Sequence, residues 1–472
     1  MSRVTLHHGD NRESLRRLID QGVRVHSVVC DPPYGLTSIQ KRFGKDGAAP
    51  AKFGTDGAFA RASAGFMGLK WDGTGIERDP EFWRLVWEIL LPGGYVVAFS
   101  GSRTGHWQAC AMEMAGFIMH PFLGWLTGQG FPKAHNAAMA IDKQLGAEGG
   151  RGAPKTAAHA GWIKRGAMRG AEGYEGWRRE WMDDPEKVAV NARRYLPGSP
   201  EAARWDGWAY GAQTLKPALE PIYVAQKPFA EKNGALNLLR HGVGAVNIDG
   251  CRVAAPGETI TTHSRGSSTA SPSRPTERSV EESGRSTRQD LVDANPRDGR
   301  HPANLLHDGS DEVLALFPQT TSGKPGIMRK GTNDGACYGA ESRAPGTPMT
   351  GFGDSGSAAR FFNCFPPDAD PIRYQSKATK ADRAGSKHPT VKPIALMQWL
   401  CRLVTPPGGT VLDPFAGSGT TGQAALNEGF DCILMEAEDQ FAADIRRRFG
   451  LADDDDFDAL LPEADDFDGL LA

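Results

Sequence analysis

Residues 31–34, Asp-Pro-Pro-Tyr, combine a carboxylate, two prolines and an aromatic ring directly after a short apolar run. The carboxylate of Asp31 can accept a hydrogen bond from an amino group. Pro32 and Pro33 fix the backbone, so the Pro32 carbonyl points in a set direction, and Tyr34 offers a face for stacking. This set suits a planar base with an exocyclic NH₂, because it would leave the nitrogen lone pair free to attack an electrophile. The alternative is an ordinary strand-to-turn junction.

A second motif, residues 413–419, reads Asp-Pro-Phe-Ala-Gly-Ser-Gly. Gly417, Gly419 and Gly422 fit G-x-G-x-x-G, which on its own also fits a dinucleotide site. The Lys of a phosphate-binding P-loop is missing. Glu436 closes the next apolar run, at a position where an acidic side chain can bind ribose hydroxyls. The alternative here is a tight turn without a ligand.

The elements that must position the first motif lie in the N-terminal third. The apolar run 25–30 predicts a buried parallel strand. Helical spacing over 79–91 predicts a helix, with Asp79 as N-cap and Pro80 at the first helical position. We expect Gly93-Gly94 to end this helix and 95–100 to form the next strand.

The second motif lies within a similar pattern. We expect a helix at 392–404, a strand at 410–413, a helix at 420–428 and a strand at 431–436. Strand, helix and strand within about 30 residues form a βαβ unit. Weaker strand patterns cover 117–126 and 221–226. The predicted fold class is therefore α/β.

The composition excludes several classes of protein. Hydrophobic residues make up 39% of the 472 residues, which is enough for a core. The first residues lack a signal-peptide pattern, and no run approaches the ~18 apolar residues of a membrane span. The seven cysteines form no C-x-x-C pair, so neither a disulfide framework nor a zinc ribbon is indicated. We expect a cytoplasmic protein that binds no metal and no membrane.

The two motifs resemble those of amino-methyltransferases that use S-adenosylmethionine (SAM). The catalytic motif precedes the cofactor motif, which is the permuted order of the β group of DNA N-methyltransferases, the N6-adenine/N4-cytosine family. The resemblance extends to 7–11 (His-His-Gly-Asp-Asn) and 388–393 (His-Pro-Thr-Val-Lys-Pro). The stretches 130–133, 220–224 and 301–304 are similar to phage- and prophage-type members.

The resemblance implies a Rossmann-like methyltransferase fold with a mostly parallel twisted sheet, circularly permuted, plus large insertions that form a target-recognition region. The implied catalytic residues are Asp31, Pro32, Pro33 and Tyr34. The implied SAM-binding residues are Asp10, Lys392, Asp413, Phe415, Ala416, Gly417, Ser418, Gly419, Thr420 and Glu436. One departure is residues 435–441, Met-Glu-Ala-Glu-Asp-Gln-Phe, which lack the Pro that the family often has after this acidic strand end.

The implied reaction is direct transfer of the SAM methyl group to a base flipped out of duplex DNA. Asp at the first motif position is commoner with adenine N6 in this family, so we expect adenine N6 and keep cytosine N4 as the alternative. Methylation at cytosine C5 needs a Cys within Pro-Cys in its own family, and this dipeptide is absent. More remote alternatives are an inactive DNA-binding protein with this fold, a nicotinamide oxidoreductase, and an RNA or protein amide methyltransferase.

The expected partner is double-stranded DNA, read by insertions into the core. We divide the chain into a catalytic half (1–129), a Trp/Arg-rich insertion (130–215), a return to the core sheet (216–255), a target-recognition region with mobile loops (256–387), a SAM-binding half (388–450) and an acidic tail (451–472). The five Trp of the insertion either contact DNA or form its small core. Whether the chain forms a homodimer, and whether it belongs to a restriction–modification system, stay open.

The net charge of −3 hides a basic body. Residues 451–472 hold nine acidic residues and no Lys or Arg, so residues 1–450 carry a net charge of +6. A basic body suits a protein that meets phosphates. The tail repeats Asp-Asp-Phe-Asp-x-Leu-Leu at 455–461 and 465–471. It is either a solvated, disordered tail or a segment that docks on the DNA cleft or on a partner.

Overall fold

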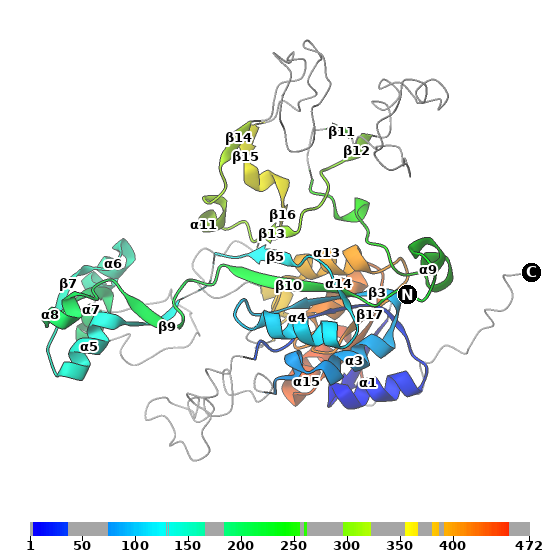
Figure 1. Cartoon of the computed structure of the whole chain (residues 1–472), viewed down its shortest axis with the longest axis horizontal. Coiled ribbons are helices and arrows are strands. Elements are labelled where there is room, and N and C mark those ends of the chain that lie inside the picture. The colour runs from blue at the N-terminus through cyan, green and yellow to red at the C-terminus, as the bar shows by residue number, and fades with distance from the viewer. Residues whose placement is uncertain are drawn as a thin grey trace, which may run out of the picture.

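A ten-stranded sheet forms the centre of the molecule (Figure 1). The computed structural model describes residues 3–35, 74–128, 130, 132–165, 184–254, 259–261, 296–321, 355–366, 380–386 and 391–452. In sheet order the strands are β1 (Val4–His8), β18 (Asp431–Glu436), β17 (Thr410–Asp413), β2 (Val25–Cys30), β3 (Leu90–Phe99), β10 (Leu219–Gln226), β5 (Leu123–Leu126), β13 (Leu305–His307) and β16 (Asn363–Cys364), with β4 (Ile118–Met119) beside β10.

The sheet is mostly parallel. β1, β18, β17, β2 and β3 all run the same way, and β10 is antiparallel to its neighbours β3 and β5. The C-terminal strands β17 and β18 lie between the N-terminal strands β1 and β2, so the chain order is permuted. Strand order reverses between β17 and β2, and open α/β sheets bind ligands outside the carboxyl ends of the strands at such a point. The α/β class and the permuted, Rossmann-like arrangement are confirmed.

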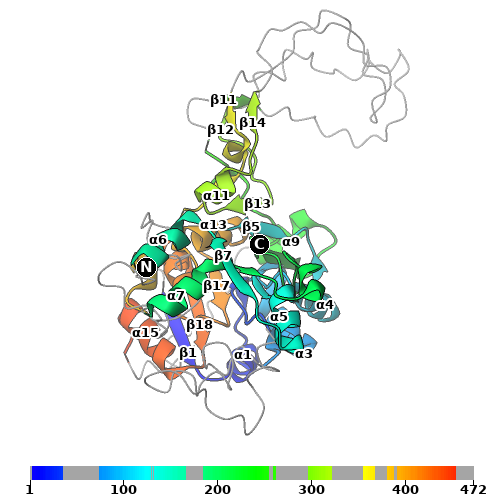
Figure 2. The same ribbon diagram turned by 90° about the vertical axis from the view of Figure 1, so that its left-hand side faces the viewer.

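Helices cover both faces of the sheet. One buried cluster joins β2 and β3 to α1 (Asn11–Asp20), α3 (Pro80–Ile89) and α4 (Gly105–Met114). The other joins the sheet to α13 (Ile394–Val404), α14 (Thr420–Asn427) and α15 (Asp439–Phe449). Figure 2 shows α15 on one side of β17 and β18, with α3 and α4 on the other.

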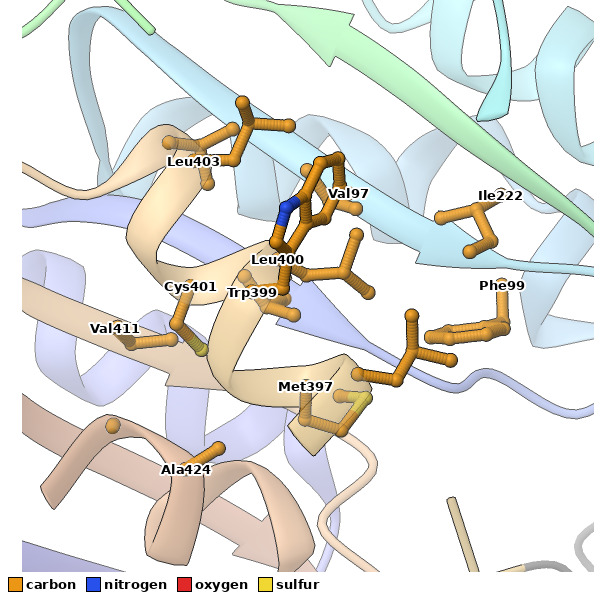
Figure 3. Packing of buried hydrophobic residues seen from close by; sticks show 14 of the residues in the cluster. Val97, Phe99, Ile222, Met397, Trp399, Leu400, Cys401, Leu403, Val411 and Ala424 are labelled. Atoms are coloured by element: carbon orange, nitrogen blue, oxygen red, sulfur yellow. The ribbon is translucent and has the colours of Figure 1, made fainter. Parts of the chain in front are cut away.

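Helix α13 is anchored deep in the core. Figure 3 shows Met397 and Leu400 lying among Val97 and Phe99 of β3 and Ile222 of β10, and all five side chains are at most 1% exposed. Burying an apolar side chain of this size stabilises the fold by about 1.5–3 kcal/mol. The start of α13 is therefore held in a fixed position, two residues after Lys392.

The predicted elements agree with the structure except around Gly93-Gly94. Asp79 caps α3 by accepting a hydrogen bond from the Glu81 amide, and Pro80 begins the helix, as expected. The expectation that the two glycines end this helix is wrong. The helix ends at Ile89, and β3 runs through both glycines, because Gly93 and Gly94 pair with the backbone of Lys227.

The region between β5 and β10 forms a separate lobe that stands off the sheet (Figure 1). It contains α5 (Ala137–Leu145), α6 (Ala157–Arg165), α7 (Pro185–Ala192) and α8 (Pro200–Ala203), with the ribbons β6 (Lys133–Asn136)–β9 (Ala209–Gln213) and β7 (Gly150–Pro154)–β8 (Arg193–Leu196). The buried carboxylate of Asp142 ties the lobe together, since it accepts hydrogen bonds from the Tyr195 hydroxyl, the Gly198 amide and the Ser199 hydroxyl.

Short elements complete the described part of the chain. They are η5 (Ile76–Arg78), α9 (Gly234–His241), η7 (Asp249–Cys251), α11 (Asp311–Leu314), η8 (Ala358–Phe361), α12 (Lys380–Arg383) and the ribbons β11 (Thr259–Thr261)–β12 (Pro296–Asp298) and β14 (Gln319–Thr321)–β15 (Ser355–Ser357). None of the helices described is long and apolar enough to cross a membrane. Most of the predicted target-recognition region 256–387, and the acidic tail from 453 on, lie outside the described residues.

Candidate active site

Strand β2 places the Asp-Pro-Pro-Tyr motif at the carboxyl edge of the sheet. β2 is hydrogen-bonded in parallel on both sides, to β17 and β3, so its end cannot move freely. Asp31 is the first residue after the strand, and Pro32 and Pro33 are buried. The Thr104 hydroxyl donates a hydrogen bond to the Tyr34 carbonyl at 2.6 Å. The motif is therefore held by the strand at one end and by the start of α4 at the other.

Lys392 lies in the middle of this motif. Its ammonium group makes an ion pair and hydrogen bond with Asp31 Oδ2 and donates a second hydrogen bond to the Tyr34 hydroxyl at 3.2 Å. Glu220 Oε2 lies 3.9 Å from the same nitrogen. The ring centroid of Phe99 is 4.5 Å away, and the Lys392 side chain is only 6% exposed. The ammonium group is thus surrounded by the carboxylates of Asp31 and Glu220 and by the rings of Tyr34 and Phe99.

The second oxygen of Asp31 is buried, and no hydrogen bond reaches it from the described residues. A buried acceptor without a donor is costly in a folded protein, by about 1–3 kcal/mol, and such atoms often mark a functional site. Burial, followed by the nearby charge of Asp31, raises the pKa of Tyr34 well above its usual value. The phenol therefore stays neutral and donates a hydrogen bond to Glu220 at 3.4 Å.

Strand β17 places Asp413 at the same edge, one strand away. Its carboxylate accepts hydrogen bonds from the Phe415 amide at 2.9 Å and from the Thr421 hydroxyl at 2.5 Å. The pKa of Asp413 is raised to about 7, mainly by burial. The charge of Asp31 also raises it, while the two hydrogen bonds and the charge of Lys392 lower it. The charges of Asp31 and Lys392 therefore act on the carboxyl group at the end of β17.

The Gly-rich segment makes a tight turn into α14. The Gly419 amide donates a hydrogen bond to the Ala416 carbonyl at 2.8 Å. Gly417 and Gly419 have φ angles of +54° and +78°, which residues other than glycine rarely adopt. Ser418 and Thr420 are buried, and their hydroxyl oxygens are hydrogen-bonded at 3.2 Å. The backbone of this turn therefore leads directly into the N-terminus of α14.

Glu436 closes the turn from the end of β18. One carboxylate oxygen accepts the Gly417 amide at 2.8 Å, and the other accepts the Glu438 amide at 2.8 Å. Burial raises the pKa of Glu436 to about 7. The Ala437 amide also donates to this carboxylate. Because an ionised carboxylate offers about four lone-pair sites, it can still accept a hydroxyl donor of a ligand.

Residues after β1 complete this edge. The Asp10 side chain caps α1 by accepting the Arg12 amide at 2.7 Å. Asn11 donates its side-chain amide to the Pro414 carbonyl at 2.9 Å, which ties the first loop of the chain to the Gly-rich turn. Phe415 packs against Phe82 of α3 with ring centroids 5.2 Å apart.

The structure thus brings the predicted site residues to a single edge, in two adjoining groups. Asp31, Tyr34 and Lys392 form one group, and Asp413 and Glu436 with the Gly-rich turn form the other. Lys392 was expected with the second group, yet its hydrogen bonds go to the first. Its role toward a cofactor stays a prediction. His388 and the segment 65–72, which flank the motifs in sequence, lie outside the described residues.

Glu220 is a member of the site that the sequence interpretation did not single out. It lies on β10 and reaches Tyr34 and Lys392 from the side of the antiparallel strand. The only sequence signal was its place in the stretch 220–224, which resembles phage-type relatives.

The lobe exposes two of its tryptophans. Trp205 and Trp208 are 46% and 62% exposed, with ring centroids 5.5 Å apart. The small core of the lobe is instead built from Ala138, Tyr195 and Ala202. The tryptophans of this insertion were expected either to contact DNA or to form its small core. A core role does not hold for Trp205 and Trp208. Trp177 and Trp181 lie outside the described residues.

The sheet and its two edge motifs define a Rossmann-like α/β domain with a nucleotide-type turn beside a carboxylate site. A family model described as DNA methylase, of the N6/N4 type, matches residues 204–447. Because this match covers more than half of the chain, the protein belongs to the N6/N4 DNA methylase family, and the family resemblance is confirmed.

Individual relatives match over shorter stretches. The chain is 38% identical over 73 residues to "Type II methyltransferase M2.DpnII" from Streptococcus pneumoniae and 42% identical over 86 residues to "Putative methylase YubD" from Escherichia coli K12. The matches span 27% and 37% of these relatives and 16% of this chain in each case. The crystal structure of the M1.HpyAVI–SAM complex is 14% identical over 95% of this chain and 100% of its own, with a TM-score of 0.36.

Proposed function

We propose that this protein is a site-specific DNA methyltransferase that transfers the methyl group of SAM to N6 of an adenine flipped out of duplex DNA. The observation that carries the proposal is the buried, unpaired Oδ1 of Asp31, at the strand end beside the Gly-rich turn. This oxygen would accept one N–H of the exocyclic amine, and the Pro32 carbonyl would accept the other. Cytosine N4 is the alternative, since the family covers both amino groups.

The residues around the Gly-rich turn fit SAM. Glu436 can still accept a hydrogen bond from a ribose hydroxyl, and the turn presents backbone rather than side chains at the start of α14. The acidic side chains Asp413 and Glu436 suit the positive charge of a sulfonium. When bound, SAM supplies an electrophilic methyl group. The chain's own contribution is to hold the amine in line and to orient its lone pair, which can lower the barrier by several kcal/mol.

Double-stranded DNA would lie along the same edge. β5 runs parallel to β2 and β17, so its carboxyl end, where the lobe begins, lies at the edge that carries Asp31. β13, which lies within the predicted target-recognition region 256–387, runs the same way. The exposed pair Trp205–Trp208 and the exposed Arg204 suit stacking and phosphate contacts. We propose that both insertions contact DNA from this edge.

The methylated base can be identified chemically. The protein is incubated with SAM and mixed-sequence DNA, and the DNA is hydrolysed to nucleosides for mass spectrometry. We expect N6-methyladenine. N4-methylcytosine alone would replace adenine by the alternative base, and the absence of both would contradict the proposed function.

The affinity for SAM should rise with pH through the pKa of Glu436. Burial raises this pKa to about 7, so the carboxylate is mostly protonated at pH 6 and mostly ionised at pH 8, where it accepts ribose hydroxyls best. If binding needs the ionised form, Kd falls about tenfold between these pH values. Glu436→Gln should bind SAM more weakly and with little pH dependence. Calorimetric titration at both pH values measures this.

The neighbouring Glu438 provides the matched control. Glu438→Gln leaves the backbone amide that Glu436 accepts and should keep the pH dependence of the unmodified protein. A Glu436→Gln variant that kept the full tenfold change would assign the titration to another group, with Asp413, whose pKa is also about 7, as the first candidate.

A further inference from the structure

The contacts of Lys392 place a hydrogen-bond donor directly beside the unpaired acceptor of Asp31. The Lys392 ammonium holds Asp31 Oδ2, while Asp31 Oδ1 stays without a donor. A carboxylate oxygen next to an ammonium N–H offers an acceptor and a donor side by side, as an Asn or Gln side chain does when it reads adenine. The pair therefore resembles an amide edge built from two side chains.

An ammonium group has three N–H bonds to donate. The described residues give Lys392 two hydrogen bonds, to Asp31 and to the Tyr34 hydroxyl. Glu220 is 3.9 Å away, which is an ion-pair distance but too long for a hydrogen bond. One N–H therefore has no acceptor within hydrogen-bond distance among the described residues, in a side chain that is 6% exposed.

Adenine and cytosine share the pattern that complements this pair. In both bases the exocyclic NH₂ is a donor, and the adjacent ring nitrogen, N1 of adenine or N3 of cytosine, is an acceptor. Thymine and guanine present a carbonyl and a ring N–H at the corresponding positions, so both contacts would be mismatched. Unpaired buried polar groups are a strong basis for such discrimination.

We propose that Lys392 is a specificity-determining residue of the proposed methyltransferase, which donates a hydrogen bond to the ring nitrogen beside the target amino group while Asp31 accepts from the amino group itself. The proposal rests on the proposed function and deepens it, since it names the amidine edge of the base as the feature recognised. Glu220 is a positioning residue: it accepts the Tyr34 hydroxyl at 3.4 Å, and its charge keeps the ammonium group between β2 and β10.

The fold supports this placement. Lys392 is followed at once by Pro393, which stands at the N-cap position of α13, and the buried side chains of α13 fix that helix against β3 and β10. The ammonium group also lies over the Phe99 ring, a cation–π contact that helps to hold it in place. Little movement is then needed for its remaining N–H to meet a base.

Base analogues that lack the ring nitrogen test the contact. Modification-aware sequencing of mixed-sequence DNA first identifies the methylated site. Two synthetic duplexes then carry this site, one with adenine and one with 1-deazaadenine at the target position. If N4 is methylated, the pair is cytosine and 3-deazacytosine. We expect the unmodified protein to use the analogue about 10- to 100-fold less well in kcat/KM, the loss typical of one hydrogen bond to a charged group. Lys392→Met should be slow on both duplexes but discriminate between them less than about twofold.

Two further variants complete the experiment. Glu220→Gln should reduce the discrimination without removing it, because the ammonium group stays but is held less firmly. Lys227→Met is the matched control, since Lys227 is also a buried lysine over an aromatic ring but lies at the opposite edge of the sheet. Lys227→Met should keep the full ratio of kcat/KM between the natural and the analogue duplex. This ratio does not depend on the fraction of protein that is folded.

The outcomes separate this proposal from the proposed function. Unchanged discrimination in Lys392→Met, or none in the unmodified protein, would overturn the role of Lys392 while leaving methylation in place. A lack of methylation on the natural duplex would overturn the proposed function and this inference with it.

Discussion

Asp31→Asn is expected to lower kcat for methyl transfer by at least about 100-fold while SAM still binds. Asn keeps the size of the side chain, but its amide nitrogen cannot accept an N–H and would face either Lys392 or the incoming amine with a second donor. The Gly-rich turn and Glu436 do not contact this side chain, so the cofactor site keeps its shape. Single-turnover kinetics measure the transfer step, and calorimetry measures the affinity for SAM.

The exposed Asp20, at the end of α1, offers a matched control. Asp20→Asn removes the same charge at a distance from the site and should leave kcat unchanged. Activity of Asp31→Asn within a few-fold of the unmodified protein would show that Asp31 does not orient the amine. Loss of SAM binding together with activity would instead mean that Asp31 supports the cofactor site.

Gly419→Ala should abolish SAM binding at accessible concentrations and lower the free energy of unfolding by about 2–4 kcal/mol. Gly419 has a φ of +78°, which strains any residue with a Cβ. A Cβ there would lie 3.0 Å from the Phe449 ring and 3.2 Å from Ile445, so these two side chains of α15 must give way. The strain would act on the turn that Glu436 closes. Thermal unfolding and calorimetric titration with SAM measure the two effects.

Gly429, at the other end of α14, separates strain from crowding. Its φ is +81°, and a Cβ at this position would meet no atom within 4 Å. Gly429→Ala should therefore cost only about 1–2 kcal/mol of unfolding free energy and leave SAM affinity unchanged. Equal losses of SAM affinity in both variants would mean that general destabilisation, rather than the shape of the turn, explains the effect at Gly419.

The sequence predicted those parts of the site that depend on local patterns. The run 25–30 and the βαβ unit at 410–436 are short, strongly apolar and bounded by Gly and Pro, so their strands and the carboxylates at their ends could be placed without the structure. Asp79 and Pro80 likewise define a helix start through local chemistry. These elements carry both motifs to the carboxyl edge of the sheet.

Features that depend on tertiary pairing could not be predicted in the same way. Gly93 and Gly94 suggest a helix end in isolation, but pairing with Lys227 keeps them within β3. Glu220 has no local signal of chemistry, because its approach to Tyr34 depends on the pairing of β10 with β3 across more than 100 residues of sequence. The sequence also could not predict whether Lys392 contacts Asp31 or Asp413, since the loop before α13 can reach the end of either strand.

The most direct test of the central claim is modification-aware sequencing of mixed-sequence DNA after incubation with the full chain and SAM. The unpaired oxygen of Asp31, set beside the Gly-rich turn, predicts modified adenines within one recurring sequence, and none when SAM is omitted. DNA that stays unmodified, although the protein is folded and binds SAM, would contradict the claim that this edge of the sheet is a DNA amino-methyltransferase site.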